Sequence, residues 1–347
     1  MRSFPEMKRI PLHERSRYNT LFLLEHYFPN SEWVRDRKAA TRARIVAHVQ
    51  HGRKGTVRPL ERLRGVGPKE FRARYLSKGI PVILERGAET WPLASQWSFD
   101  NFTRRYGHEM IKLVQRKGVA ADQEVVNGRE FSEEIQFGAF LAQVQNGGAK
   151  YMRFSPLLEK FPELLDDFDH AFFKAMSGNG WGLTYQLFMG GTGTFTPLHN
   201  AMTPFFFVNV CGTKRWALVP NHYLAILNPS ADGFGYNHSG AAIDLSNVEA
   251  FPGLDYIDRM DAVMEPGDIL FLPSWMWHCV KNDSPTIGVR CGFIYPKGMV
   301  AEASTLSFIR LFAARNPSTF EALYYVFFRT NLPERDKWLL TAKLIRR

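Results

Sequence analysis

The segment Pro266–His278, PGDILFLPSWMWH, is the part of this 347-residue chain that decides its fold. It begins with Pro-Gly, which is typical of a type II turn, continues as a short apolar strand and ends on a histidine. Similar β-prone runs lie nearby: Pro204–Cys211 (PFFFVNVC) turns tightly into Lys214–Val219, and Thr286–Ile294 forms a returning strand. Several short strands separated by Gly and Pro turns indicate a β-sandwich or a barrel.

A second segment, TPLHNA at Thr196–Ala201, also places a histidine beside a proline at the edge of a strand. A metal site needs rigid and converging positions, so His199 and His278 are the candidate metal ligands. The hairpin that follows carries Lys214, fifteen residues after His199. A lysine on a barrel strand offers a point charge to a carboxylate.

These motifs resemble the JmjC/cupin-like branch of the Fe(II)- and 2-oxoglutarate-dependent oxygenases, which includes the asparaginyl hydroxylase of the hypoxia-inducible factor. The stretches EFRARYLSKGIPVILERGAETWPLASQWSFDNFTRRYG and KYMRFSPLLEKFPELLDDF are similar to segments that precede the family's barrel. The resemblance covers roughly residues 62–298. It implies a mainly β fold, a double-stranded β-helix (jelly-roll) barrel flanked by α-helices, with Fe(II) and 2-oxoglutarate as cofactors.

The resemblance also implies roles for individual residues. His199 and His278 match the two iron-binding histidines. Lys214 matches the lysine that pairs with the distal carboxylate of 2-oxoglutarate, and Thr196 matches a hydroxyl that holds the same carboxylate. Tyr185, on the preceding strand, is expected to be a further contact of this co-substrate.

Two positions depart from the family pattern. The iron motif is His-x-Asp/Glu followed by a distant His, and Ala201 occupies the carboxylate position here. Phe205 stands six residues after the first histidine, where an Asn is common in the family. The first departure removes an anionic metal ligand, and the second makes the predicted co-substrate pocket more apolar.

The interpretation that we favour from sequence is a halogenase. Related halogenases carry Ala or Gly at this position, and chloride fills the vacated coordination site, so Ala201 predicts halogenation of an unactivated C–H bond. Asn200 or Arg290 is then expected to help hold the anion, and Trp275 to line the substrate pocket.

Two alternatives stay open. The first is a hydroxylase of a peptide, a lipid or a small metabolite, with two histidines plus water or a remote ligand such as Asp268 or His238. Asp268 is better explained by the Pro-Gly-Asp turn, and the histidines outside the motifs, His238 among them, are expected to be ordinary surface or core residues. The second alternative is a cupin-like binding protein without catalysis.

The formal charge of +10 is concentrated in one stretch. From Arg35 to Lys78 there are 14 Lys or Arg and 3 acids, a net charge of +11, so the rest of the chain sums to −1. This stretch predicts either docking of an acidic partner, such as a carrier protein that delivers a tethered substrate, or a solvated basic helical face. No zinc-finger or helix-turn-helix signature accompanies it, which argues against nucleic acid as the partner.

The chain divides into three predicted parts. Residues 1–60 form a basic, mostly helical extension, residues 61–300 form the barrel domain, and residues 301–347 form apolar helices that cover the barrel or mediate a homodimer. No stretch of the sequence approaches the length of a membrane span, and the N-terminus lacks the apolar region of a signal peptide. The three cysteines are far apart and are expected to be reduced thiols, which predicts a cytoplasmic protein.

Overall fold

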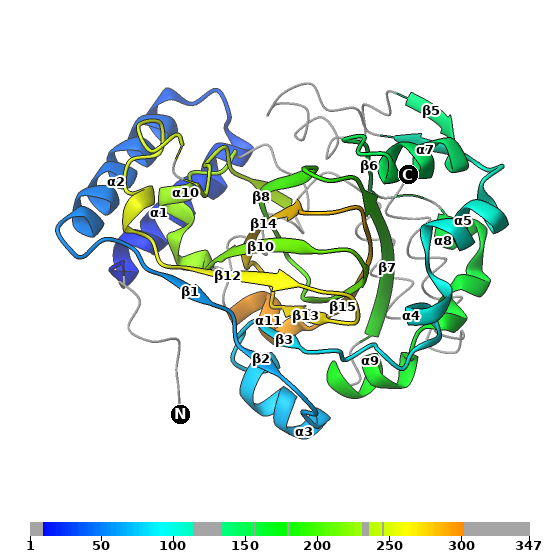
Figure 1. Ribbon diagram of the computed structural model, residues 1–347. Helices are drawn as coiled ribbons and strands as arrows, with labels where there is room; N and C mark the ends of the chain where they lie inside the picture. The colour runs from blue at the N-terminus through cyan, green and yellow to red at the C-terminus, as the bar shows by residue number, and fades with distance from the viewer. Residues whose placement is uncertain are drawn as a thin grey trace.

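The computed structural model describes residues 10–113, 133–153, 155, 157–178, 181–230, 236–244 and 246–301. Two β-sheets form its centre, with helices on both sides (Figure 1). The predicted C-terminal helices, and with them the predicted dimer contact, lie outside the described residues, apart from the short helix α11 (Pro296–Ala301).

The first sheet has six strands in the order β1-β12-β10-β14-β8-β11. All its neighbours pair antiparallel except β1 and β12. Since β8 and β14 come from the two histidine motifs, this sheet carries both candidate ligands. Its strands are β1 (Val57–Pro59), β8 (Phe195–Ala201), β10 (Lys214–Val219), β11 (Tyr236–His238), β12 (Arg259–Met264) and β14 (Trp277–Asn282).

The second sheet has seven strands in the order β2-β3-β13-β9-β15-β7-β6. Its two longest strands, β7 and β15, pair antiparallel. Its strands are β2 (Arg62–Leu63), β3 (Val82–Leu84), β6 (Tyr151–Met152), β7 (Trp181–Gly190), β9 (Phe205–Cys211), β13 (Ile269–Leu272) and β15 (Thr286–Ile294). A separate ribbon pairs β4 (Met110–Leu113) with β5 (Glu133–Gln136).

The inner faces of the two sheets share one apolar core. Phe207 and Leu270 from the seven-stranded sheet pack with Trp216, Leu218 and Met264 from the six-stranded sheet. Side chains alternate between the two faces of a strand, so the residues next to these point outward. This arrangement confirms the mainly β fold with a jelly-roll barrel flanked by helices.

The outer face of the seven-stranded sheet is covered by a helical layer, which Figure 1 shows beside β7. Aromatic side chains fill the contact: Phe71, Phe173 and Phe206 belong to the same buried cluster. The layer consists of α3 (Pro68–Phe71), the π-helical turn Arg72–Leu76, α4 (Pro92–Gln96), α5 (Phe99–Tyr106), α7 (Phe137–Gln145), α8 (Leu157–Lys160), the 3₁₀ turn Pro162–Asp167 and α9 (His170–Met176).

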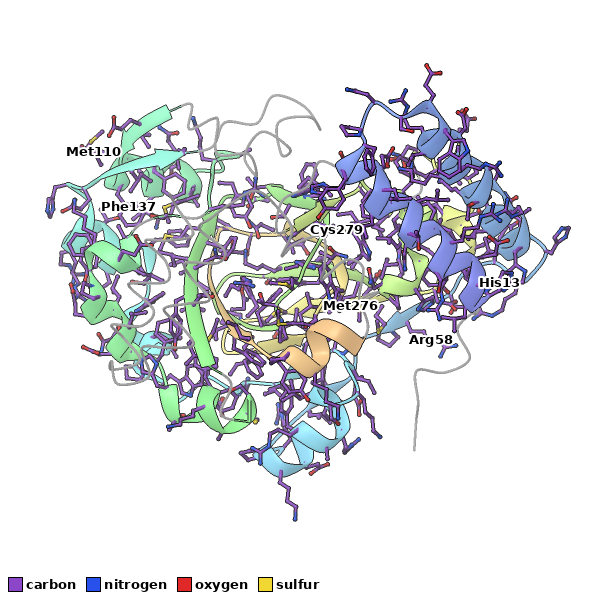
Figure 2. The ribbon with its side chains drawn as sticks, turned by 180° about the vertical axis from the view of Figure 1, so that it is seen from behind. His13, Arg58, Met110, Phe137, Met276 and Cys279 are labelled. Carbon is purple, nitrogen blue, oxygen red and sulfur yellow. The ribbon has the colours of Figure 1, made fainter. Side chains whose placement is uncertain are left out.

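The outer face of the six-stranded sheet packs against the N-terminal helices α1 (Leu12–Tyr27) and α2 (Glu32–Gln50) and the short helix α10 (Leu224–Leu227). Trp277 is part of this second cluster and Cys279 packs against it, whereas Met276 belongs to the core between the sheets. Figure 2 labels Met276 in the middle of the barrel and Cys279 towards α1 and α2. Strand β14 therefore alternates, with Val280 in the core between the sheets and Trp277 and Cys279 on the helical side.

The structure also shows how much of the basic segment 35–78 is used inside the molecule. Arg53 forms two hydrogen bonds with buried Asp258, and Arg62 pairs with buried Asp268. Others cap backbone carbonyls or pair with acids outside the segment: Arg42 with Ala225 and Ile226, Lys38 with Glu25, Arg44 with Glu14, Lys54 with Asp255, and Arg64 with Glu85. The expected docking of an acidic partner finds no support here, because the acids of the chain itself neutralise much of the segment.

None of the helices in the described ranges combines the length and the apolar character needed to cross a membrane.

Candidate functional site

His199 on β8 and His278 on β14 lie directly opposite each other in the six-stranded sheet. Residues opposite one another in an antiparallel pair point to the same face, and here that face is the barrel interior. Their ring centroids are 4.1 Å apart. In each ring Nδ1 lies near the carbonyl two residues earlier, at 2.8 Å from Pro197 O and 2.9 Å from Met276 O. A carbonyl only accepts, so each Nδ1 carries the proton and each Nε2 keeps a lone pair, as a metal ligand requires.

Both imidazoles are neutral near pH 7. Burial lowers the pKa of His278 to about 4. Burial also lowers the pKa of His199 well below its ordinary value, and the neighbouring rings of His278 and His238 lower it further. Only the neutral form of histidine binds a metal, so these surroundings keep both rings competent for binding across the physiological pH range.

A β-bulge in β8 explains the spacing of the Thr196–Ala201 motif. His199 pairs with His278, but Thr196 pairs with Val280, so three residues of β8 span two residues of β14. The extra residue lets Thr196 and His199 face the same side although they are three positions apart. The motif therefore delivers a hydroxyl and an imidazole to one interior surface.

Lys214 is completely buried on the same interior face. Its Nζ donates to Asn282 Oδ1 at 2.7 Å and to Thr286 Oγ1 at 2.9 Å. Both acceptors are neutral, and no carboxylate of the described residues pairs with this lysine. Burial lowers the pKa of Lys214 to about 7. An ammonium in such surroundings has one hydrogen left to donate and lacks a counter-charge.

Tyr151 on β6 connects Lys214 with Thr196, and we did not single it out from the sequence. Thr196 Oγ1 donates to the Tyr151 hydroxyl at 3.3 Å, and Lys214 Nζ lies 5.9 Å from the centre of the tyrosine ring. The only signal in the sequence is its position in the KYMRF stretch before the barrel. These three side chains form a polar cluster on the interior face.

Apolar rings line the barrel around His278. Trp216 stacks on its ring with centroids 5.7 Å apart, and Phe205 meets it edge-on at 5.6 Å. Phe207 in turn packs against Trp216 at 5.0 Å. Phe205 therefore provides the apolar wall that its departure from the family pattern predicts.

Arg290 on β15 is the second cation inside the barrel. It is 8% exposed and its guanidinium lies over the Phe205 ring, 4.7 Å from the centroid. It donates to Thr203 Oγ1 at 2.9 Å and to Gln186 Oε1 at 3.4 Å. In the part of the chain that the structure describes, no carboxylate pairs with it. Since it also lowers the pKa of His278 through its charge, Arg290 brings positive potential to the histidine pair.

Ala201 lies two residues beyond His199 on the same strand, so it faces the same side. It is 5% exposed, and its carbonyl accepts a hydrogen bond from the Trp275 backbone N–H at 2.7 Å. The Ala201 backbone is thus fixed beside the histidine pair, but its methyl side chain has no atom that can bind a metal.

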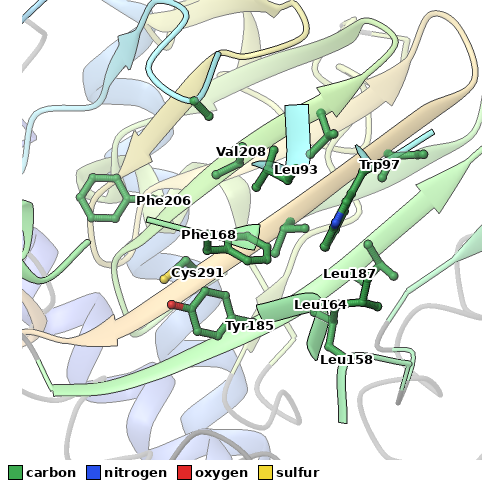
Figure 3. Packing of buried hydrophobic residues seen from close by; sticks show 14 of the residues in the cluster. Leu93, Trp97, Leu158, Leu164, Phe168, Tyr185, Leu187, Phe206, Val208 and Cys291 are labelled. Carbon is green, nitrogen blue, oxygen red and sulfur yellow. The ribbon is translucent and has the colours of Figure 1, made fainter. Parts of the chain in front are cut away.

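The expectation for Tyr185 was wrong. Tyr185 packs in the cluster between the seven-stranded sheet and its helical layer, with Cys291 and Phe168, as Figure 3 shows. Its hydroxyl bonds with His170 Nδ1 at 2.8 Å. Alternation along β7 turns Tyr185 outward, and it is Gln186 that reaches the interior to meet Arg290.

The expectation for Asn200 was also wrong, whereas the expectation for Trp275 stays a prediction. The Asn200 amide is fully buried and donates to Asn221 Oδ1 and to the Trp275 carbonyl, each at 3.2 Å. It follows His199 directly and so points to the opposite face of β8. The Trp275 indole is 1% exposed and donates to the Met299 carbonyl at 2.8 Å. The Asn200 side chain thus lies behind the site, whereas the Trp275 indole packs against Met202, the residue after Ala201.

Asp268 belongs to its turn, as the sequence favours. Its carboxylate accepts from the backbone N–H groups of Glu265 and Arg86 and pairs with Arg62 at 2.9 Å. It is therefore not available as a remote metal ligand.

The donor set fits Fe(II) and 2-oxoglutarate in two respects. Two neutral imidazoles present their Nε2 atoms from adjacent strands, and Lys214 supplies a buried cation suited to a carboxylate. As the side chains stand, no three His, Cys, Asp or Glu residues in the described ranges cluster closely enough to enclose a metal. The roles of His199, His278, Lys214, Thr196 and Arg290 stay predictions.

Comparison with known proteins places residues 68–293 in the family described as cupin-like domain. "Lysine-specific demethylase JMJ30" of Arabidopsis thaliana is 25% identical over 246 residues, which are 67% of this chain and 54% of that protein. "Lysine-specific demethylase 8" of Danio rerio is 24% identical over 220 residues (62% and 53%), and "Arginine-specific demethylase JMJ20" of Arabidopsis thaliana is 24% identical over 271 residues (66% and 56%). This chain thus spans about half the length of these three relatives.

Proposed function

This chain belongs to the cupin-like domain family, within the JmjC/cupin superfamily of Fe(II)- and 2-oxoglutarate-dependent oxygenases, and we propose that it hydroxylates a C–H bond of a protein or peptide side chain. Iron and 2-oxoglutarate together supply the oxidising power for such a reaction: O₂ and 2-oxoglutarate are consumed, succinate and CO₂ leave, and the substrate C–H becomes C–OH. The residues of the barrel bind, orient and shield these partners.

The observation that carries the proposal is the state of Lys214. Burying an ammonium without an acidic partner costs free energy, and binding of a carboxylate beside it recovers part of that cost. Asn282 and Thr286 aim the Nζ atom, and Thr196 with Tyr151 adds hydroxyl groups beside it. This cluster suits one carboxylate of 2-oxoglutarate, and the histidine pair on the same face suits a metal at its other end.

The histidine pair and the apolar wall have separate tasks in this proposal. Pro197 O and Met276 O hold the two rings in the tautomer that leaves Nε2 for a metal. Phe205 and Trp216 exclude water from around His278, which strengthens electrostatic interactions inside the barrel.

The names of the relatives support a substrate on a protein. They refer to lysine- and arginine-specific demethylation. Hydroxylation of an N-methyl carbon gives an unstable N–CH₂OH group, which releases formaldehyde and leaves N–H. Demethylation is therefore one form of the same hydroxylation chemistry, and methylated lysine and arginine peptides are the first substrates to test.

Halogenation is the second candidate, and Ala201 is the observation that favours it. Its methyl group leaves room that chloride fills in the halogenase analogy, and Arg290 adds positive charge near His278. The relatives named here give halogenation no support, so we place it behind hydroxylation.

Anaerobic loading with Fe(II) and 2-oxoglutarate, followed by O₂, tests the proposal. We expect succinate and hydroxylated or demethylated peptide, with the same yield in chloride-free buffer. The matched control is Lys214→Met, which keeps the volume and removes the charge, and it should form little succinate. A chlorinated product that forms only when chloride is present would overturn the proposed hydroxylation and support halogenation. Absence of both 2-oxoglutarate binding and succinate formation would mean a non-catalytic barrel.

A further inference from the structure

We propose that His238 is the third protein ligand of the metal and takes the place of the carboxylate that Ala201 cannot supply. The inference rests on the proposed function, because it concerns the same metal. The His-x-Asp/Glu motif of the family does not include His238, which the sequence offered only as one remote ligand of the hydroxylase alternative.

The first argument is strand register. His278 on β14 pairs with His199 on β8, and His199 pairs in turn with His238 on β11. The three histidines therefore form one row across three adjacent antiparallel strands, with their side chains on the same face. A row of three imidazoles on neighbouring strands is a donor set that the family's usual motif does not require.

The second argument is distance. The ring centroids of His199 and His278 are 4.1 Å apart, and those of His199 and His238 are 5.7 Å apart. Two imidazoles that bind one metal through Nε2, at about 2.1 Å each, have centroids roughly 4.5–5.5 Å apart for ligand angles of about 90–120°. Both pairs are within about half an ångström of this range.

The third argument is the position of the vacancy. Ala201 pairs with Tyr236 on β11, two residues before His238. His238 is thus the diagonal neighbour of Ala201 across the strand pair, close enough for a long side chain to reach the same space. The methyl group of Ala201 leaves that space open to an incoming imidazole, whereas an Asp there would compete for the metal.

The fourth argument is that the backbone holds His238 in place. Its carbonyl accepts from the Ser230 N–H at 3.2 Å, and the next residue, Ser239, donates its N–H to Leu198 O at 3.0 Å. The Ser239 hydroxyl also donates to Leu227 O. His238 is therefore anchored from both sides.

Only a rotation of the ring separates the present arrangement from a closed site. The His199 and His238 rings are nearly parallel, with an interplanar angle of 18°. The Nε2 lone pair of an imidazole lies in the plane of its ring, and two stacked, nearly parallel planes do not meet at one nearby metal. The His238 ring must therefore turn about its side-chain torsions to bring its lone pair to the metal. The χ2 torsion of histidine is broad, so this turn needs no movement of β11.

A third imidazole has a chemical consequence. It fills one face of the metal with protein ligands, as two histidines and a carboxylate do in the usual site, and leaves the remaining positions for 2-oxoglutarate and O₂. Chloride then has no vacancy to fill. The inference thus explains how a chain with Ala201 can hydroxylate.

Co(II) binding to the full chain, without any turnover, tests this inference. We expect X-ray absorption of the Co(II)-loaded protein to count three imidazoles, and two in His238→Ala. Loss of a direct ligand should weaken Co(II) binding about 100-fold or more, because loss of even an outer-shell partner costs about 10–100-fold. His222→Ala is the matched control, since His222 is also partly buried but its ring lies against Tyr223, with centroids 4.1 Å apart, and the variant should bind Co(II) as the parent does.

A rescue variant guards against misfolding. Adding Ala201→Asp to His238→Ala supplies the carboxylate of the usual motif, and we expect it to restore most of the Co(II) affinity with two imidazoles and one carboxylate. Two imidazoles in the parent, with equal affinity in His238→Ala, would overturn the role of His238 and leave the proposed function intact. A parent that binds neither Co(II) nor 2-oxoglutarate would overturn both.

Discussion

Most arginines and lysines of the segment 35–78 lie on the outside of the molecule, whereas Lys214 and Arg290 lie inside the barrel. Outside, Arg53 meets Asp258 and Arg64 meets Glu85. Inside, Lys214 donates to an amide and a hydroxyl, and Arg290 donates to a hydroxyl and an amide. Several of the outer cations thus have acidic partners from the chain, while Lys214 and Arg290 donate to neutral groups within the described residues.

This difference separates structural charge from functional charge. A cation that pairs with an acid of its own chain is neutralised when the chain folds. A buried cation with only neutral acceptors is not neutralised, and an anionic ligand can supply the missing negative charge. The sequence concentrates its positive charge in the outer set, segment 35–78. The cations that are placed to bind an anionic ligand are the inner ones, Lys214 and Arg290.

Replacing Lys214 by Met should have the largest effect on the inner set. We expect 2-oxoglutarate affinity, measured by calorimetry, to fall about 100-fold or more, because losing one partner of a buried charge pair costs about 2–5 kcal/mol. The free energy of unfolding should stay within about 1 kcal/mol of the parent, since the variant no longer buries a charge. A variant that binds 2-oxoglutarate normally would remove Lys214 from the site.

Among the outer cations, replacing Arg53 by Met should have the largest effect. It should lower the free energy of unfolding and leave ligand affinity unchanged. Arg53 holds Asp258, which is 5% exposed, through two hydrogen bonds of 2.8 and 2.9 Å. Loss of a partner from a buried pair costs about 3–5 kcal/mol, and we expect about 2 kcal/mol here because Arg53 is partly exposed and Thr56 keeps its bonds to Asp258.

Denaturant unfolding of Arg53→Met measures this loss, and calorimetry should show unchanged 2-oxoglutarate affinity. A large loss of affinity at normal stability would contradict the separation of the two sets.

The pH dependence of 2-oxoglutarate binding gives a smaller effect with a definite sign. The pKa of Lys214 is about 7 in the ligand-free protein, and a bound carboxylate raises it. The charged form binds, so affinity is highest below pH 7 and falls as pH rises through 7, by about fivefold between pH 7 and pH 8. Calorimetry in buffers of different ionisation enthalpy should detect proton uptake on binding. Affinity that rises with pH in this window would show that Lys214 is not the responsible group.

The smallest effect is expected for Arg64→Gln. The Arg64–Glu85 pair, at 3.0 Å, is largely exposed, and such pairs contribute little because water screens them. We expect no measurable change in melting temperature or in 2-oxoglutarate affinity. A clear loss of either would mean that the outer pairs do more than neutralise charge.

Much of the site could be predicted from the sequence because its signals are local. Residue type and spacing within Thr196–Ala201 and Pro266–His278 mark the two histidines, and spacing from His199 marks Lys214. The predicted hairpin was wrong, because β9 and β10 follow each other in the chain but lie in different sheets. Tyr185 could not be predicted correctly, because the face that a residue occupies on a ten-residue strand depends on long-range pairing.

The sequence by itself determined the barrel class, the two motif histidines, the lysine and the missing carboxylate, since residue type and short-range spacing specify these features. Only the tertiary structure decided which side chains share the interior: it turned Tyr185 and Asn200 outward, brought Tyr151 to Thr196 and set His238 beside His199. The physical reason is register. Strands that are distant in sequence pair through backbone hydrogen bonds, and a shift of one residue would reverse every side chain on the strand.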